Sequence, residues 1–305
     1  MLPAVSEFYA KIPLNTQLCY GRPAVRRLMV QAVVDYARSH PEEQVIHVWL
    51  ADGANNHCEC AACRKHRPSD LYVDVLNAID AGLTARRLST RIVFLAYVDL
   101  LWAPVRARIR NPARFILMFA PITRTYSRPF GAAGSAGRLE RVGDYVRNGL
   151  VFPTSPEGNL RLLRGWQRAF HGEQVDFDYH LWRDWVLDPG QMQISRVLQA
   201  DLAGLARLGM NGYISCQAQR VAFPTALPLH VMGKTLWNAR IPFDDLARDY
   251  FRDLYGRAGD RIRRLQEEVS RRIDPAYLRG EKKRPLDHRR AARAYAELAD
   301  WIGRQ

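Results

Sequence analysis

The stretch Arg91–Ala120, RIVFLAYVDLLWAPVRARIRNPARFILMFA, contains two short runs of branched and aromatic apolar residues. Near-continuous apolar runs of this length are typical of strands that are buried on both faces of a parallel sheet. We therefore predict strands at Arg91–Tyr97 and Arg114–Ala120. Similar runs predict four more strands, of which the first is the weakest: Thr16–Tyr20, Gln44–Leu50, Val175–His180 and Gly212–Cys216.

Helical patterns separate these runs, and strand–helix alternation favours parallel βα units with right-handed crossovers. The helices between the runs are expected at Ala24–Ser39, Ser69–Leu88, Leu160–Phe170 and Gln191–Leu208. Later in the chain only helical patterns occur, at Leu227–Asn238, Phe243–Tyr255, Asp260–Ile273 and Leu286–Gly303. We therefore predict two parts: residues 1–225 form βα units of a barrel, and residues 226–305 form an α-helical region that packs on them.

The number of strands limits the kind of barrel. A closed TIM barrel has eight parallel strands, and we expect about five to six here. The predicted fold class is α/β, a partial or incomplete TIM barrel that is followed by a C-terminal helical region. Either the sheet is open, or the chain is the later part of a barrel that an upstream segment or a partner chain completes.

Composition and charge narrow the functional classes. With 48% hydrophobic and 25% charged residues, the chain is expected to be globular. No apolar run has the length of about 18–20 residues that a membrane span needs, so no membrane partner is expected. The net charge is +14, but 40 of the 45 basic residues are arginines scattered among acidic residues, so we expect no nucleic-acid partner. The N-terminal residues lack the pattern of a signal peptide, which favours a cytoplasmic location by default.

The most specific local pattern is Trp49–Cys63, WLADGANNHCECAAC. Its three cysteines, Cys58, Cys60 and Cys63, share one tight loop. Cys19 lies at the end of the weak strand predicted at Thr16–Tyr20, just before the strand at Gln44–Leu50 in the sequence, so we expect the four thiols to converge. Four thiolates would hold a structural zinc ion, with His57 or His66 as substitute ligands. A local disulfide and simple packing of the thiols are the alternatives. The fifth cysteine, Cys216, is expected to be a core residue.

Strand ends provide the candidates for catalysis and binding, because barrel enzymes place their catalytic groups at the C-terminal ends of the strands. Asp52 and Asp178 are the predicted catalytic carboxylates, although Asp52 could also merely cap a turn with Gly53. Aromatic rings suit the C–H faces of sugars, and an arginine would favour an anionic sugar such as a uronic acid. The predicted substrate-binding residues are Trp49, Tyr97, Arg124, Tyr179 and Trp182.

A long segment, Thr123–Pro156, has neither a strand pattern nor a helix pattern. It includes a tract of small residues at Gly131–Gly137. Loops of this length in compact domains are usually functional lids or disordered segments, and both interpretations stay open.

A series of short motifs runs through the chain: Gln17–Gly21, Asp52–Gly53 with the cysteine loop, Ser69–Asp70, Asn77, Phe94–Tyr97, Asp178–Tyr179, Leu236–Asn238 and Asp249–Gly256. Together they resemble the bacterial family catalogued as domain of unknown function 4838, over residues 5–265. That family is similar to glycoside hydrolases with TIM-barrel catalytic domains, notably the α-glucuronidase and β-hexosaminidase groups. The resemblance implies a barrel, a carbohydrate partner and a site at the strand ends, with Asp52 after the fourth barrel strand. Members are usually longer and carry the early barrel strands, and full-length relatives can be exported.

The expected function is that of a glycoside hydrolase-like protein that hydrolyses a glycosidic bond, for example of a uronic acid or an amino sugar. Asp52 and Asp178 would be the paired carboxylates, and catalysis would need no cofactor. A separation of about 5–5.5 Å would indicate a retaining enzyme, and about 6.5–9.5 Å an inverting one. The alternative is a non-catalytic carbohydrate-binding protein or a truncated scaffold with a structural cysteine loop. A zinc-dependent nucleic-acid-binding protein is a third hypothesis.

Overall fold

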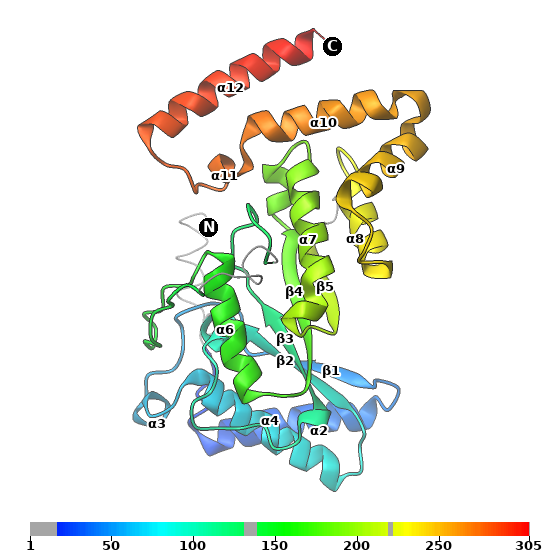
Figure 1. Cartoon of the computed structure of the whole chain (residues 1–305). Coiled ribbons are helices and arrows are strands. Elements are labelled where there is room, and N and C mark those ends of the chain that lie inside the picture. The colour runs from blue at the N-terminus through cyan, green and yellow to red at the C-terminus, as the bar shows by residue number, and fades with distance from the viewer. Residues whose placement is uncertain (1–16, 131–138, 219–221, 305) are drawn as a thin grey trace. The chain divides into compact units, whose positions relative to one another are not determined.

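The computed structural model describes residues 17–130, 139–218 and 222–304 of the chain (Figure 1). Five strands form one sheet in which each strand lies beside the next one in the sequence. The strands are β1 (Val45–Val48), β2 (Arg91–Tyr97), β3 (Phe115–Ala120), β4 (Glu173–Leu181) and β5 (Gly212–Gln217). The fold is therefore α/β, a partial barrel of parallel strands that is followed by a helical C-terminal region.

Helices occupy most of the connections and the whole C-terminal region. They are α2 (Pro23–Ser39), α3 (Ala61–Arg64), α4 (Pro68–Ala85), α6 (Pro156–Ala169), α7 (Met192–Leu208), α8 (Leu227–Trp237), α9 (Phe243–Tyr255), α10 (Gly259–Ile273), α11 (Pro275–Leu278) and α12 (Pro285–Gly303). Short 3₁₀ helices lie at Val98–Leu101, Pro112–Arg114, Asp184–Leu187 and Gly256–Ala258. In the part of the chain that the structure describes, no helix is both long and apolar enough to cross a membrane.

The five clear strand predictions are confirmed, and the sixth is wrong for the residues that can be described. Gln17–Tyr20 forms no strand, and its leucine, Leu18, is 54% exposed. This segment instead contacts the loop after β1, where the backbone N–H of Gln17 donates to the carbonyl of Asn56 at 3.1 Å. The tract Gly131–Gly137 lies outside the described residues.

The strand register brings the ends of the strands to a common edge. Val48 pairs with Phe94, and Tyr97, the last residue of β2, pairs with Ala120, the last residue of β3. In a parallel pair the C-terminal ends of both strands point the same way. The segments that follow β1, β2 and β3 therefore begin at the same edge of the sheet.

The chain divides into two compact units. The first comprises Met1–Arg124, Arg138–Phe177 and Met210–Gly212, and the second comprises Thr125–Gly137, Asp178–Gly209 and Tyr213–Gln305. The first unit therefore contains β1 to β3 with α2, α3, α4 and α6. The second contains α7 to α12.

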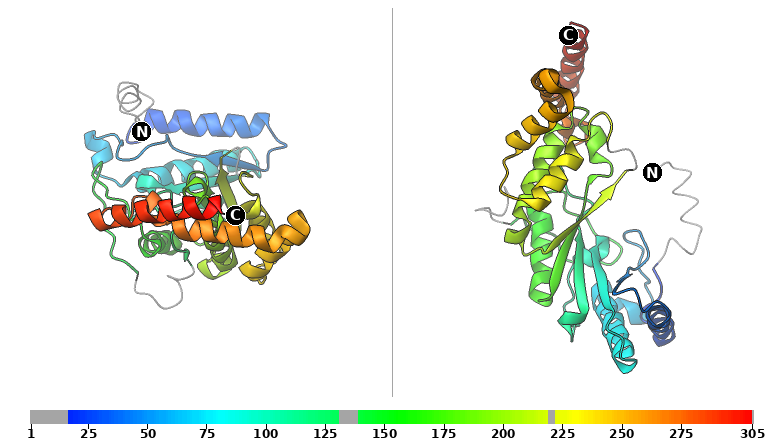
Figure 2. Two further views of the ribbon diagram at one scale, coloured as in Figure 1. Left: turned by 90° about the horizontal axis from the view of Figure 1, so that it is seen from above. Right: turned by 90° about the vertical axis from the view of Figure 1, so that its right-hand side faces the viewer.

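An aromatic cluster forms the centre of the first unit. The buried ring of Phe94 lies edge-on or tilted against the rings of Tyr72, Phe115, Trp166 and Phe170, with centroids 5.2 to 6.2 Å apart. Offset and edge-to-face contacts at these separations are the stabilising arrangements of aromatic pairs. The cluster joins α4 and α6 to the middle of the sheet, while α2 packs against α4 (Figure 2).

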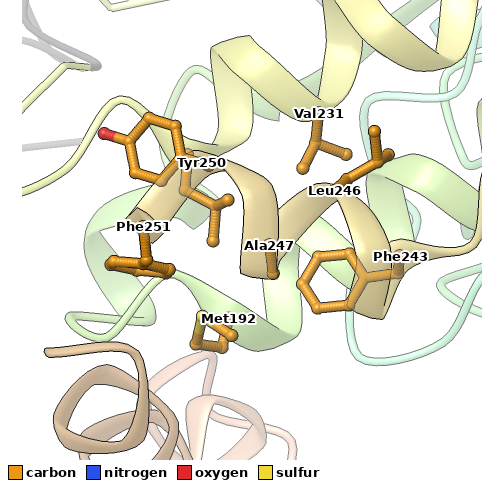
Figure 3. Packing of buried hydrophobic residues seen from close by; sticks show 8 residues of the cluster. Met192, Val231, Phe243, Leu246, Ala247, Tyr250 and Phe251 are labelled. Atoms are coloured by element: carbon orange, nitrogen blue, oxygen red, sulfur yellow. The ribbon is translucent and has the colours of Figure 1, made fainter. Parts of the chain in front are cut away.

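The core of the second unit is helical. α7, α8 and α9 enclose a cluster of buried apolar side chains, seen in Figure 3: Met192, Leu227, Val231, Phe243, Leu246, Ala247, Tyr250 and Phe251. Their spacing in α9, at positions i, i+3, i+4, i+7 and i+8, is the stripe of an amphipathic helix. α10 in turn packs against α7, α9 and α12.

Candidate functional site

Asp52 lies on an exposed turn four residues after β1. Its Oδ1 accepts a hydrogen bond from the backbone N–H of Gly53 at 2.8 Å and from the hydroxyl of Tyr97 at 3.1 Å. The first bond is the predicted turn cap, and Gly53 has a φ of 113°, which favours glycine. The second bond joins two predicted site residues across the ends of β1 and β2. The capped carboxylate nevertheless stays accessible from solvent.

Trp49, the residue directly after β1, presents an indole ring at the same strand end and is 46% exposed. The ring makes edge contacts with His47, at a centroid distance of 5.6 Å, and with Phe177, at 6.1 Å. These contacts hold a large aromatic surface that remains partly open. Such a surface can stack on an apolar face of a ligand.

Asp178, the other predicted catalytic residue, is fully buried in the second unit. Its Oδ1 accepts hydrogen bonds from the hydroxyl of Tyr126 and from the backbone N–H of Tyr179, the latter at 2.8 Å. Its Oδ2 lies 3.8 Å from Nδ1 of His180. Asp178 thus belongs to an internal polar network, whereas Asp52 belongs to the first unit and is exposed.

The same network continues through His180. Nε2 of His180 lies 2.9 Å from Oδ2 of Asp201, and its Nδ1 lies 3.2 Å from the hydroxyl of Tyr213. Both ring nitrogens therefore have a partner. Asp178, His180 and Asp201 bring three metal-ligating groups within 4.8 Å, but the hydrogen bonds already account for their arrangement. Asp201 was not expected from the sequence, because a single Asp inside an amphipathic helix carries no local signal.

The remaining predicted binding residues differ in exposure. Arg124 is 4% exposed and Tyr179 is 7% exposed, so neither presents a free side chain at the surface. Trp182 is 44% exposed, and its ring lies 5.9 Å from that of Tyr179. Of these three residues, Trp182 offers the surface that a ligand could reach.

The four predicted cysteines converge in the first unit. Their Sγ atoms all lie within 4.8 Å of one another. Sγ of Cys19 is 3.6 Å from that of Cys60 and 3.8 Å from that of Cys63, and all the cysteines are free thiols. Burial raises the pKa of Cys63 to about 12, whereas the backbone N–H of Cys63 is the main cause that lowers the pKa of Cys60 to about 6. Neither His57 nor His66 belongs to this group of described ligands.

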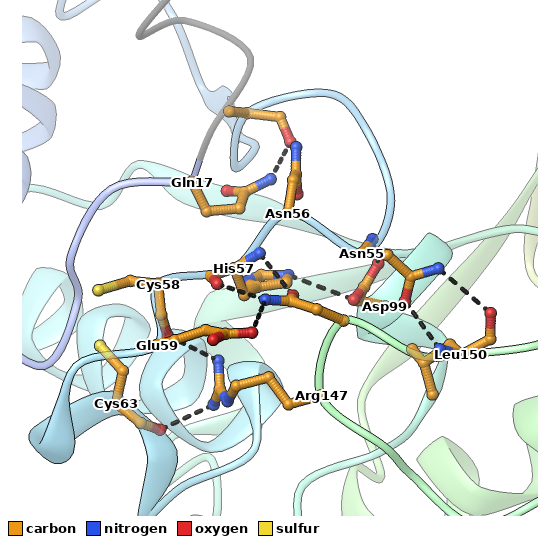
Figure 4. A network of polar contacts seen from close by, with 12 residues as sticks. Gln17, Asn55, Asn56, His57, Cys58, Glu59, Cys63, Asp99, Arg147 and Leu150 are labelled. Carbon is orange, nitrogen blue, oxygen red and sulfur yellow. Dashed lines mark hydrogen bonds and ion pairs between the residues drawn. The ribbon is translucent and has the colours of Figure 1, made fainter. Parts of the chain in front are cut away.

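Arg147 and Asn148, two residues of the long segment after β3, hold the cysteine loop, and Figure 4 shows the contacts of Arg147. The guanidinium of Arg147 donates to the backbone carbonyls of Cys58 at 3.1 Å, Cys63 at 2.7 Å and His66 at 2.5 Å. The Asn148 amide accepts from the backbone N–H of His57 and donates to its carbonyl, both at 2.8 Å. Arg147 and Asn148 therefore fasten the loop by hydrogen bonds, and we call these two residues the strap. No sequence pattern marks the two residues, since their partners lie about 80–90 positions away.

A buried acid lies beneath the start of the same loop. Asp99 is fully buried, and its Oδ2 accepts from the backbone N–H of Asn55 at 2.9 Å. Oδ1 of Asp99 lies 3.9 Å from Nε2 of His57 (Figure 4). Burial raises the pKa of Asp99 and lowers that of His57 to about 4, with the charge of Arg147 as a smaller cause for His57. Asp99 thus supports the loop from below and is not presented to solvent.

Arginines surround a hollow of about 440 Å³ elsewhere in the first unit: Arg67, Arg108, Arg161 and Arg168. Asp144 also lines the hollow. Among the described residues, no carboxylate lies within ion-pair distance of these four guanidinium groups. The volume falls in the range of about 300–1,000 Å³ that is usual for small-molecule pockets. The hollow therefore suits a small anionic group.

Comparison with curated proteins and with solved structures found no match. The model of one family, described as Domain of unknown function (DUF4838), matches residues 6–145. The matched residues include Asp52, Tyr97 and the four clustered cysteines, whereas the motifs at Leu236–Asn238 and Asp249–Gly256 lie outside them. Residues 6–145, a little under half of the chain, are therefore similar to the DUF4838 family.

Proposed function

We propose that this protein is a glycoside hydrolase-like, carbohydrate-active protein that binds its ligand at the C-terminal ends of β1 and β2. One observation carries the proposal: the exposed Asp52 carboxylate is bonded to the hydroxyl of Tyr97, and the open indole of Trp49 lies three residues before it. A carboxylate and a hydroxyl can bind sugar hydroxyls, while an indole stacks on the C–H face of a sugar ring. This combination is the one that carbohydrate recognition needs.

In the catalytic form of the proposal, Asp52 acts as the nucleophile or as the base that activates water. The Tyr97 hydroxyl orients the carboxylate through its hydrogen bond to Oδ1. Glycoside hydrolysis also needs a carboxylic acid that protonates the leaving oxygen. Asp178, the residue predicted for that role from the sequence, belongs to the second unit. No step of this chemistry requires a metal, so the zinc ion expected at the cysteines would have a structural role.

The surroundings of Asp178 favour a second candidate function, carbohydrate binding without turnover. Its carboxylate is fully buried and already accepts hydrogen bonds from Tyr126 and Tyr179. A general acid must reach the leaving oxygen of the substrate within hydrogen-bond distance. If Asp178 keeps its buried position when a ligand is bound, the site can hold a sugar but lacks its acid.

The arginine-lined hollow supports an anionic sugar as the ligand class. Guanidinium groups bind carboxylates through paired hydrogen bonds, and these arginines have no carboxylate partner among the described residues. Arg124, the arginine expected to do this, is buried. We therefore propose the hollow, rather than Arg124, as the place in the first unit where a sugar carboxylate would bind, separate from the site of Asp52, Tyr97 and Trp49.

A hydrolysis screen separates the two forms of the proposal. Aryl glycosides and aryl uronides are incubated with the wild-type chain, with Asp52→Asn, and with Asp35→Asn as a control on α2, outside the proposed site. Turnover that falls by at least about 100-fold in Asp52→Asn and is unchanged in the control supports catalysis by Asp52. Turnover that is equal in all three proteins would contradict that role. Glycan binding without any turnover would favour the non-catalytic form.

A further inference from the structure

We propose that Cys19, Cys58, Cys60 and Cys63 bind one zinc ion as a tetrahedral thiolate site, and that Arg147 is its outer-sphere positioning residue. The site would join the segment before α2 to the loop between β1 and α4. It is independent of the carbohydrate proposal, because neither its ligands nor its test involves a sugar.

The distances between the sulfur atoms support a metal rather than a disulfide. In a tetrahedral site with zinc–sulfur bonds of about 2.3 Å, the sulfur atoms lie about 3.8 Å apart. Sγ of Cys19 lies 3.6 Å from that of Cys60 and 3.8 Å from that of Cys63. A disulfide would bring two of these atoms to about 2.05 Å. Simple packing also fails as an explanation, because Cys60 is exposed and gains little from apolar burial.

The backbone beside the cluster is shaped for a thiolate. The N–H of Gly21 donates to Sγ of Cys63 at 3.2 Å. A Cβ on Gly21 would lie 2.8 Å from that sulfur and 3.0 Å from the backbone nitrogen of Cys63. Such close approach of a main chain to a ligand sulfur requires glycine at this position. The segment at Gly21 therefore provides a hydrogen-bond donor as well as the ligand Cys19.

Arg147, in the strap, provides hydrogen bonds in the outer coordination sphere of the proposed site. Arg147 donates to the carbonyls of Cys58 and Cys63, two of the four ligand residues. A zinc ion with four thiolates carries a net charge of about −2, which the guanidinium partly balances. Outer-sphere groups of this kind orient the ligands, and their loss typically weakens metal binding about 10- to 100-fold.

Four soft thiolates select zinc or iron among the common metals. We commit to zinc, because a single tetrahedral ion matches the observed sulfur spacing. Iron in the purified protein would therefore overturn the proposal.

The first test measures metal in the full chain after purification under reducing conditions. We expect about one zinc per chain in the wild type and in Cys216→Ser, and loss of zinc in Cys60→Ser. Cys216 is a fair control because it lies on β5 and outside the cluster. Absence of stoichiometric zinc in the folded wild type, a Cys60→Ser protein that keeps its zinc, or a disulfide among these cysteines in intact-mass analysis would overturn the proposal.

A second measurement does not depend on whether the cysteine variant folds. The wild-type chain is stripped of metal under reducing conditions and reloaded with cobalt(II), which reports its own geometry by absorption. The strong bands of tetrahedral cobalt with sulfur-to-metal charge transfer are expected, and zinc should abolish them. A weak octahedral spectrum would contradict the site.

The role of Arg147 is tested by zinc affinity in competition with a chromophoric chelator. Arg147→Lys should weaken zinc binding by about 10-fold or more, while Arg164→Lys, on the exposed face of α6, should leave it unchanged. Circular dichroism of the zinc-loaded proteins should be the same for both variants. Equal affinities in both variants would remove Arg147 from the site.

Discussion

A carboxylate can act on a ligand only if the ligand can reach it, and in this respect Asp52 and Asp178 differ. Asp52 lies on an exposed turn, whereas Asp178 is fully buried. Both were predicted by the same argument, their position near the end of a strand. Side chains alternate between the faces of a strand, and along β4 the buried polar residues Asp176, Asp178 and His180 share one face. Position near a strand end is therefore a weaker guide than the face on which a residue lies.

This difference leads to a prediction for Asp178→Asn. The substitution keeps one oxygen that can accept from the Tyr126 hydroxyl and the Tyr179 N–H, but it replaces the carboxylate oxygen near Nδ1 of His180 with an amide NH2 inside a fully buried network. We therefore expect the free energy of unfolding to fall by about 1–3 kcal/mol. Asp52→Asn changes an exposed turn and should alter stability by no more than about 0.5 kcal/mol. Urea denaturation of both variants provides the comparison. An Asp178→Asn protein of unchanged stability would contradict the structural role that the network implies.

At the scale of single elements, the cysteine loop depends on contacts with a distant segment for its structure. α3 has four residues, far fewer than a helix needs to be stable alone. Arg147 and Asn148 hold the loop from a segment more than 80 positions away. The grouping of Cys58, Cys60 and Cys63 could be predicted from their spacing. Cys19 was expected beside them as the end of a strand that does not form, and the strap could not be predicted. Hydrogen bonds between distant irregular segments leave no periodic pattern in a sequence.

Glu268 on α10 should give the helical region a measurable dependence on pH. Hydrogen bonds from Arg271 and Arg272 lower the pKa of Glu268 from 4.5 to about 2. Because the pKa is lowered in the folded state, the stabilisation is present above pH 4.5 and is lost as the pH falls through 2. Glu268→Gln should therefore lower stability at pH 7 and have less effect near pH 2. A stability difference between wild type and variant that stays constant from pH 7 to pH 2 would contradict this assignment.

Gly190, two residues before α7, allows the chain to approach α10 closely. A Cβ on Gly190 would lie 2.2 Å from the carbonyl oxygen of Gln266 and 2.5 Å from Oγ of Ser270. Gly190→Ala should therefore lower the free energy of unfolding by about 1–3 kcal/mol. Gly233→Ala on α8 is the matched control, since nothing lies within 4 Å of its added Cβ and alanine favours a helix. Thermal unfolding of the two variants should shift in opposite directions, and a Gly190→Ala protein as stable as the control would contradict the contact.

For the whole molecule, the positions of the strands could be predicted closely from the sequence, whereas the burial of individual side chains could not. β2 spans Arg91–Tyr97 as predicted, because a strand that is buried on both faces is apolar throughout. The sixth strand, predicted at Thr16–Tyr20, does not form at Gln17–Tyr20. This segment bonds to the loop after β1 and does not join the sheet. The completion of the barrel by an upstream segment or a partner chain stays a prediction.

Some features relevant to the proposed site at the ends of β1 and β2 could be predicted, and others could not. Position after the strands led us to predict Asp52, Tyr97 and Trp49 as site residues, and the bond between Asp52 and Tyr97 follows from the parallel register of β1 and β2. The burial of Arg124 and the arginine-lined hollow could not be predicted. Both depend on how distant segments pack around side chains, which a local pattern does not encode.

The central claim is tested most directly by carbohydrate binding at this strand edge. Calorimetric titration with neutral and uronic-acid oligosaccharides compares the wild type with Trp49→Ala, and with Trp237→Ala as a control on an indole that is 90% exposed outside the site. We predict binding that falls at least about 10-fold, or about 1.4 kcal/mol, in Trp49→Ala and is unchanged in the control. A wild-type protein that binds no member of the panel, or a ligand held equally well by all three proteins, would contradict the claim.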